Sequence, residues 1–174
     1  MLAVGLRRTT LAEISRTAKV SRMTLYRRFP DVRSVLAALM TREFGAVLRQ
    51  AGNHGSAAPT ARERLVLSCV AAVRLLNTDP LMRAMLDKDA EVILPYIVER
   101  LGTTQQAGEQ VVLAVLGAGR HDGSIRISDV KVQARAILLV VQSFVLSLRA
   151  ATTDVAADDL LDELAHHLDS ALRP

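Results

Sequence analysis

Apolar side chains recur every three or four residues along most of this 174-residue chain. That spacing is the period of an α-helix that buries one face, and it disfavours strands, whose period is two. Only 9 glycines and 5 prolines interrupt the pattern, too few for the many turns of a sandwich or barrel. The sequence therefore predicts an all-α fold. The expected helices cover residues 10–17, 22–29, 31–50, 60–77, 80–88, 89–101, 104–118, 128–150 and 154–172.

The composition excludes several classes of protein. Half of the residues are hydrophobic, which is enough to bury a sizeable core and argues against a disordered tail. The single cysteine, Cys69, excludes a disulfide framework and a cysteine-rich zinc module, so a cytoplasmic location is the simplest expectation. Residues 1–6 are too short for a signal peptide. The most apolar stretch, residues 136–148, is shorter than the ~20 residues of a membrane span, so no membrane partner is expected.

Charge is distributed unevenly between two parts of the chain. Residues 1–50 hold ten Arg and Lys against three acids, whereas residues 51–174 hold 12 against 15. A basic end on a mildly acidic body is typical of proteins that hold a polyanion such as DNA, although a solvated arginine-rich surface is the alternative. Small and turn-forming residues at 51–59 provide a natural break. We therefore expect one domain over residues 1–50 and a second over residues 51–174.

The N-terminal part contains two short helices that are joined by a tight turn. Thr10 and Glu13 form a capping box that opens the first helix, and Ser21 is a good N-cap for the second. Two short helices in this order, the second one basic, predict a helix-turn-helix, whose second helix enters the major groove of DNA. A plain helical hairpin is the alternative. The expected inner face consists of Ile14, Ala18, Leu25 and Phe29, and the outer face of Arg22, Met23, Thr24, Tyr26, Arg27 and Arg28.

The segment from Thr9 to Pro30 closely resembles the DNA-binding signature of TetR/AcrR-type repressors. The positions that match the family pattern are Thr9, Thr10, Ile14, Ala18, Val20, Ser21, Thr24, Leu25, Tyr26, Phe29 and Pro30. The resemblance implies a homodimeric transcriptional regulator with a helix-turn-helix domain that binds double-stranded operator DNA. It also implies a helical body that binds a small ligand and forms the dimer. Beyond residues 5–45 the resemblance rests on size, helix count and short echoes such as Asp122–Arg126.

The same region departs from the family pattern in four ways. Lys19 occupies a left-handed turn position where the family usually has glycine, and Met23 replaces a small residue that faces DNA. Val32 stands where a lysine is usual, with Arg33 beside it. Family members begin with a full helix that covers the helix-turn-helix, whereas only about eight residues precede Thr10. The residues expected to lose cover are Ile14, Leu25, Phe29 and Leu36.

The outer face and its flanks divide into two sets of expected DNA contacts. Phosphate contacts position a protein on the duplex, and base contacts specify the sequence. The residues assigned to phosphate contacts, partly by resemblance, are Thr10, Lys19, Tyr26 and Arg33. Those assigned to base readout are Arg22, Thr24 and Arg27, because their side chains leave the outer face of the second helix. Met23 either touches a thymine methyl or fills space, and Arg28 is left open between readout and solvation.

The body can hold an apolar cavity between its helices, although a closed core explains the same residues about as well. The residues expected to line the cavity are Cys69, Val73, Met85, Tyr96, Val112 and Gln142, with Tyr96 and Gln142 as polar handles. A small apolar molecule would be the ligand. The expected dimer interface pairs the helices 128–150 and 154–172 across a two-fold axis as a four-helix bundle. The second helix carries a leucine stripe, which the alternative uses up inside one chain: Leu160, Leu161, Leu164, Leu168 and Leu172.

No pattern in the chain indicates catalysis. The adjacent His166 and His167 point about 100° apart on a helix, which suits a shared metal ion poorly. The segment 117–123 contains loop glycines, but no strand precedes it, so it does not predict a phosphate site. We therefore expect no enzyme activity, no cofactor and no metal ion. Two functions remain: a ligand-responsive TetR-like repressor, and an all-helical protein-interaction module whose DNA-binding head is disabled by N-terminal truncation.

Overall fold

The computed structural model describes residues 9–91, 94–95 and 99–174. Over these residues it contains helices and no strands, which confirms the predicted all-α fold. The helix expected over residues 89–101 lies partly outside the described residues. The helices are α1 (Leu11–Thr17), α2 (Arg22–Arg28), α3 (Val32–Gly55), α4 (Ala61–Thr78), α5 (Pro80–Lys88), α7 (Thr103–His121), α8 (Val130–Ala151) and α9 (Ala157–Leu172).

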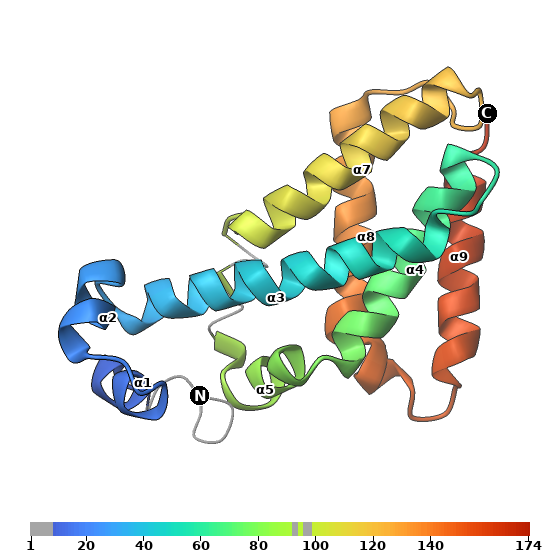
Figure 1. Ribbon diagram of the computed structural model, residues 1–174. Coiled ribbons are helices and arrows are strands. Elements are labelled where there is room, and N and C mark those ends of the chain that lie inside the picture. The colour runs from blue at the N-terminus through green and yellow to red at the C-terminus, as the bar shows by residue number, and fades with distance from the viewer. Residues whose placement is uncertain (1–8, 92–93, 96–98) are drawn as a thin grey trace.

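The molecule has two parts that one long helix connects (Figure 1). We call α1, α2 and the turn between them the head, and the helices from α4 to α9 the body. α3 runs from the head along the body, so that its two ends belong to different parts. Within the body, α4 occupies the middle and contacts α3, α5, α7, α8 and α9.

The core of the body is aliphatic. The largest side chains that are fully withdrawn from solvent are Val73, Met85, Leu116, Leu161, Leu164 and Leu172. Burying an aliphatic side chain of this size contributes about 1.5–3 kcal/mol, so this set anchors α4, α5, α7 and α9 to one another. The core is therefore built by contacts between helices that are far apart in the sequence.

The break expected at residues 51–59 is partly helical. α3 continues to Gly55, and Ala51 packs against Ala71 and Ala72 of α4. Gly55 allows the two helices to approach closely, because a Cβ there would lie 2.5 Å from the Arg64 carbonyl oxygen. The connection between head and body is thus a continuous helix, and the loop that follows it joins α3 to α4 at the surface.

The loop after α7 fastens three ends of the body together. The Ala61 amide donates a hydrogen bond to Asp122 Oδ2 (2.8 Å), and the Arg62 amide donates to Ser124 Oγ (3.2 Å). The Arg126 amide donates to the Leu172 carbonyl oxygen (2.9 Å). These bonds join the start of α4, the end of α7 and the end of α9. The short Asp122–Arg126 segment therefore has a structural role in this chain.

The leucine stripe of α9 faces the core of its own chain. Leu161, Leu164, Leu168 and Leu172 are buried, and Leu160 is half-buried. This arrangement follows the alternative expectation, in which the stripe is used inside one chain. The outward face of α9 is mainly polar, so the leucines of this helix are not available to a second molecule.

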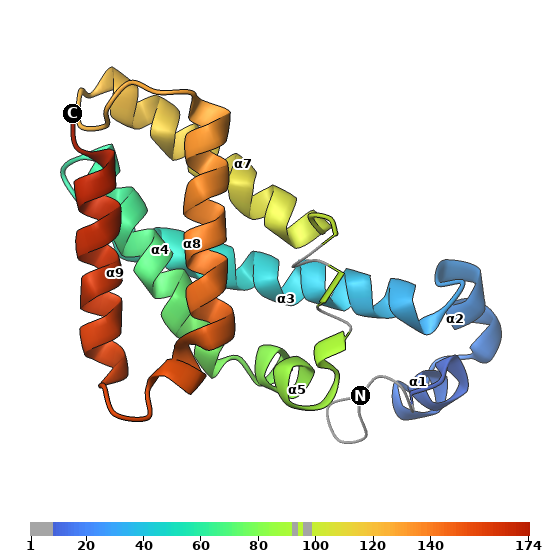
Figure 2. The same ribbon diagram turned by 180° about the vertical axis from the view of Figure 1, so that it is seen from behind.

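α8 is the most apolar helix of the body and lies beside α9 on the face seen in Figure 2. Its 22 residues, with a mean hydropathy of 1.6 in the most apolar window, are long and apolar enough to cross a membrane by length and composition alone. The expectation from the sequence considered only residues 136–148, and this shorter stretch does not show that the whole helix has such a length. In this fold α8 packs against α4, α7 and α9.

Candidate DNA interface and cavity

The head begins with a closed pair of hydrogen bonds at the start of α1. The Glu13 amide donates to Thr10 Oγ1 (3.2 Å), and the Thr10 amide donates to Glu13 Oε2 (3.0 Å). The predicted capping box is therefore confirmed. The Thr10 hydroxyl also donates to the same carboxylate oxygen (3.1 Å), so a phosphate contact from this hydroxyl would have to replace that bond.

The turn between α1 and α2 uses a left-handed residue. Lys19 has φ +54°, as expected for the position where the family pattern has glycine. The Val20 amide donates to the Ser15 carbonyl oxygen (3.0 Å), which closes the turn. Ser21 then caps α2 by accepting a hydrogen bond from the Thr24 amide (3.1 Å), as predicted. These local bonds set the direction in which α2 leaves the turn.

The inner face of the head buries few of the predicted side chains. Leu25 and Leu36 are buried, so the expectation that they lose cover is wrong for these two residues. Ile14 and Phe29 are half-buried. Ala18 is exposed, so its predicted place in the core is also wrong, because α1 ends at Thr17 and Ala18 already belongs to the turn.

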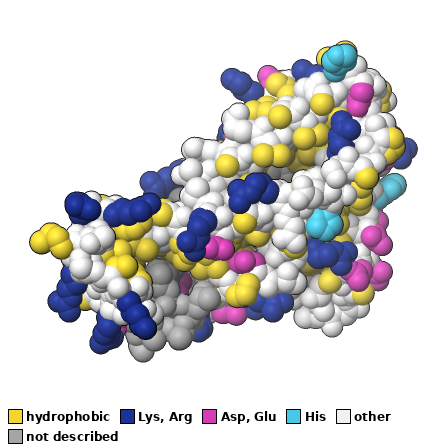
Figure 3. All heavy atoms as spheres, in the orientation of Figure 1, with side chains coloured by type: hydrophobic (Ala, Val, Ile, Leu, Met, Phe, Trp, Pro, Cys, Tyr) yellow, Lys and Arg dark blue, Asp and Glu magenta, His cyan; other side chains and the backbone are white. Residues whose placement is uncertain are grey.

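The outer face of α2 is exposed and positively charged. Within the described part of the chain, Arg22 and Arg27 form no ion pair. Met23 is 79% exposed and Tyr26 is 51% exposed, so both side chains are available to a partner. Arg28 instead lies over the Phe29 ring (5.8 Å to its centroid). Figure 3 shows that Lys and Arg side chains surround the end of the molecule that α1 and α2 form.

The Thr24 hydroxyl is less available than the arginines beside it. It shares a hydrogen bond of 2.8 Å with Ser21 Oγ at the start of α2. Lys19, which precedes α2 in the sequence, and Arg33, which follows it, are both exposed. Arg16, in the last turn of α1, is a further exposed cation that the sequence analysis did not assign to DNA. In the sequence, only the positive charge of Arg16 indicates a contact with DNA.

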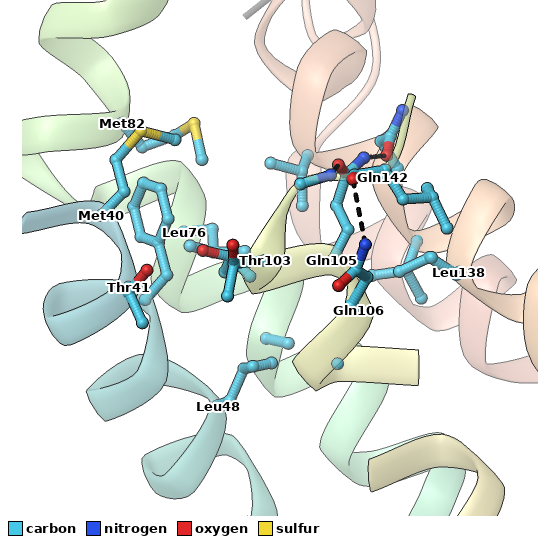
Figure 4. Close-up of a pocket in the computed structure, with 18 of the residues that line it drawn as sticks. Met40, Thr41, Leu48, Leu76, Met82, Thr103, Gln105, Gln106, Leu138 and Gln142 are labelled. Carbon is cyan, nitrogen blue, oxygen red and sulfur yellow. Dashed lines mark hydrogen bonds between the residues drawn. The ribbon is translucent and has the colours of Figure 1, made fainter. Parts of the chain in front are cut away.

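The body contains a cavity of about 380 Å³. Its described walls come from α3, α4, α5, α7 and α8 and from the residues just before α7. The lining is mainly apolar, and Figure 4 shows Met40, Leu76 and Met82 on one side with Gln105, Gln142 and Leu138 on the other. The cavity therefore lies between α3, the helix that carries the head, and α8.

Comparison with known proteins relates the chain to one family. Residues 1–39 match the family model described as bacterial regulatory proteins, tetR family. An uncharacterized HTH-type transcriptional regulator of Mycobacterium tuberculosis is 38% identical over 168 residues, which cover 97% of this chain and 86% of the relative. A relative with the same description in Mycobacterium bovis is equally similar.

The chain belongs to the TetR family. It is thus a DNA-binding transcriptional regulator. The fold also matches solved structures at low sequence identity. FadR from Bacillus subtilis, in complex with stearoyl-CoA, has a TM-score of 0.69 at 17% identity, covering 97% of this chain and 91% of FadR. The repressor AlkX from Dietzia sp. has a TM-score of 0.66 at 18% identity, covering 97% and 87%.

The cavity of this TetR-family regulator includes only part of the predicted lining. Met85 and Gln142 line it, whereas Tyr96 lies outside the described residues. Cys69, Val73 and Val112 do not line it, because they face the closed core between the body helices. Burial raises the pKa of the Cys69 thiol to about 12, so this side chain stays protonated and acts as a small hydrophobe.

The sequence analysis missed the contribution of α3. The side chains from this helix that line the cavity are Ala37, Met40, Thr41, Phe44 and Leu48. The predicted lining does not include them, because the predicted division assigns all of residues 1–50 to the DNA-binding domain. The signal was present, since apolar residues continue along this helix well past the length that the head needs.

One wall of the cavity carries hydrogen-bonding side chains from two helices. The Gly102 amide, at the start of α7, donates to Gln105 Oε1 (2.7 Å). Gln105 Nε2 donates to Gln142 Oε1 on α8. Beside this wall, Arg135 of α8 forms an ion pair with Glu109 of α7 (2.7 Å), and that guanidinium hydrogen bond lowers the pKa of the Glu109 carboxyl. α7 and α8 are thus held together by polar contacts next to the cavity.

Proposed function

We propose that this TetR-family regulator is a homodimeric cytoplasmic repressor whose DNA binding is controlled by a small apolar ligand in the cavity. The observation that carries the proposal is the double role of α3. Its N-terminal end follows α2 after only Phe29, Pro30 and Asp31, and its middle part lines the cavity. A ligand that touches α3 therefore touches the helix on which the recognition helix is mounted.

The short connection between α2 and α3 favours mechanical coupling. Asp31 caps α3 by accepting a hydrogen bond from the Ser34 amide (2.7 Å), and this bond lowers the pKa of the Asp31 carboxyl. The start of α3 is thus well defined, so a tilt of α3 moves α2. A ligand shifts the protein between two orientations only as far as its affinity differs between them.

The apolar lining supports an apolar ligand. The cavity volume of about 380 Å³ lies within the range of about 300–1,000 Å³ that small-molecule sites usually have. Two proteins of similar fold are linked to long hydrocarbon chains, since FadR was crystallised with stearoyl-CoA, whose acyl part is one, and AlkX is implicated in n-alkane biodegradation. We also propose that residues 1–50 form the DNA-binding domain and residues 51–174 the ligand-binding domain. α3 spans the boundary between them, and part of it lines the cavity.

The outward face of α8 supports the homodimer. Val132, Leu139 and Val140 expose apolar surface there. Ala136, Ser143 and Ser147 are exposed on the same face, so the stripe is uncharged. Two copies of this face, with α9 alongside, would form a four-helix bundle across a two-fold axis. Because the leucines of α9 are buried in their own chain, α8 supplies most of the apolar surface of the interface.

The roles of the head residues follow from their exposure. We propose that Lys19, Tyr26 and Arg33, with Thr10, contact phosphates, and that Arg22, Thr24 and Arg27 read base edges. An arginine contact to guanine contributes about 1–3 kcal/mol of discrimination between bases. Met23 stands between these arginines and is free to meet a thymine methyl group.

Selection of binding sites from random duplex DNA tests the head without a known operator. We expect an inverted repeat whose half-sites lie about 10 bp apart, one turn of the duplex. Arg22→Ala should relax the sequence preference, whereas Tyr26→Phe should weaken selected and random DNA equally in fluorescence anisotropy. Equal losses on both DNAs for Arg22→Ala would contradict its readout role. Absence of any selected site would favour the interaction-module alternative.

Analytical ultracentrifugation tests the dimer. Leu139→Glu places a charge on the α8 face and should convert the protein to a monomer with reduced operator affinity. Val111→Glu is the matched control, because Val111 is exposed to a similar extent and lies on α7, outside the proposed face of α8 and α9. The homodimer through α8 would be wrong if Leu139→Glu left the sedimentation coefficient unchanged.

A further inference from the structure

The hydrogen bonds at the polar wall of the cavity determine which atoms face which. The Gly102 amide can only donate, so Gln105 must turn its Oε1 toward it (2.7 Å). Gln105 Nε2 therefore faces Gln142 and requires an acceptor, which is Gln142 Oε1. The Nε2 group of Gln142 is left with its N–H donors, for which the described residues provide no partner. The wall thus offers hydrogen-bond donors to a ligand.

The charge of the lining limits what the donors can bind. Among the described lining residues no carboxylate is present to pair with a cation. Arg100 is the charged one, but it is exposed and already has a partner, so it is not a free counter-ion for an anion. The remaining polar groups are amides and hydroxyls, such as Thr41, which donates to the Ala37 carbonyl oxygen (2.8 Å). Transferring an ion into such surroundings is far more costly than transferring a neutral group that is hydrogen-bonded. A neutral acceptor therefore fits the Gln142 amide best.

The shape of the cavity indicates a single chain. On α3 the lining extends from Ala37 to Leu48, a distance of about 16 Å at the rise of an α-helix. An elongated and mainly apolar cavity of this kind suits an extended hydrocarbon chain.

We propose that the cavity binds a straight-chain molecule with a neutral oxygen head group, a hydroxyl or a carbonyl, which accepts a hydrogen bond from Gln142. Gln105 is the positioning residue, because it holds the Gln142 amide with its donors free. This inference rests on the proposed function of the cavity as a ligand site. It adds the chemistry of the head group and the pair of side chains that recognises it.

Isothermal titration calorimetry on the full chain tests the proposal with three probes that share a ten-carbon chain: 1-decanol, decanoate and decyltrimethylammonium. We expect 1-decanol to bind at least tenfold more tightly than either ion. Tighter binding of decanoate would overturn the proposal and assign the head group to Arg100, and Arg100→Gln would then remove that preference. Binding of none of the three probes would also overturn it.

Variants of the glutamine pair separate recognition from folding. Gln142→Leu should weaken 1-decanol about five- to tenfold, the effect of losing one hydrogen bond, while decyltrimethylammonium changes little. Gln105→Leu should act in the same direction, and it replaces Gln142→Leu if that variant fails to fold. Gln110→Leu, on the exposed side of α7, is the control that should leave all affinities unchanged. Equal weakening of every probe by Gln142→Leu would contradict the role in recognition.

The failure of this proposal can be told apart from the failure of the proposed function. Site selection on DNA and sedimentation of the α8 variants use no ligand, so their outcomes do not depend on the head group. A protein that selects an inverted repeat and dimerises, but prefers decanoate, remains a repressor with a different ligand class.

Discussion

The head and the body of this regulator are stabilised by contacts of very different range. In the head, the bonds that shape each helix join residues three apart, as between Thr10 and Glu13 or between Ser21 and Thr24. In the body, Ala61 is bonded to Asp122, and Arg149 of α8 to Asp87 of α5 (2.6 Å). A surface for DNA can therefore be encoded in a short sequence motif. A cavity needs helices from the whole chain.

Removing one buried leucine from each part should give the largest contrast. Leu164→Ala in α9, where the side chain is 1% exposed, should lower the free energy of unfolding by about 2–5 kcal/mol. Leu25→Ala in the head should reduce DNA affinity strongly and change the main unfolding transition much less. Urea unfolding followed by circular dichroism checks both variants. If Leu25→Ala lowered the main transition as much as Leu164→Ala, head and body would unfold as one unit.

Two glycines of α7 should respond with opposite signs. A Cβ at Gly119 would overlap the Ile125 side chain, so Gly119→Ala should destabilise the body by about 1–3 kcal/mol. Gly117 has no neighbour within 4 Å, so Gly117→Ala should stabilise the protein by about 0.5–1 kcal/mol through helix propensity. Thermal unfolding of the two variants measures the difference. Similar melting temperatures would show that Ile125 moves aside at little cost.

Acid should weaken the body through Asp122. Hydrogen bonds from the Ser124 side chain and then from the Ala61 and Ser124 amides lower its pKa from 3.8 to about 2. Because the folded carboxyl has the lower pKa, its contribution to stability is present above about pH 4 and is lost as the pH falls toward 2. Asp122→Asn should therefore flatten the fall in stability between pH 4 and 2. If stability fell equally steeply with pH in Asp122→Asn, the loss of stability in acid would not come from Asp122.

The same contrast in range explains what could be predicted from the sequence. The capping box, the Ser21 cap and the exposed arginines follow from neighbouring residues, whereas the left-handed Lys19 follows from the family resemblance. The structure contains all of them. The all-α class follows from periodicity. The prediction that Ala18 lies in the core is wrong, because the spacing of apolar residues does not distinguish the last residue of a short helix from the first residue of the turn that follows it.

The cavity could be anticipated only in part. Met85 and Gln142 belong to it, whereas Cys69 and Val73 of α4 face the closed core. Periodicity shows that one face of α4 is buried, but it does not show which residues on that face meet another side chain and which meet empty space. That distinction depends on how α3, α7 and α8 pack around it. For the same reason the sequence could not decide whether the leucines of α9 face their own chain.

Lys19 should have effects of opposite sign on stability and on DNA binding. Its φ of +54° is unfavourable for a side chain with a Cβ, so Lys19→Gly should stabilise the head by about 1 kcal/mol. The same change removes a cation beside α2 from each subunit and should weaken selected and random DNA alike, lowering the slope of log K against log salt by about 2 for the dimer. Lys19→Ala is the matched control, because it removes the charge and keeps the strain. It should lose DNA affinity without gaining stability, and an unchanged salt slope in both variants would show that Lys19 does not contact phosphate.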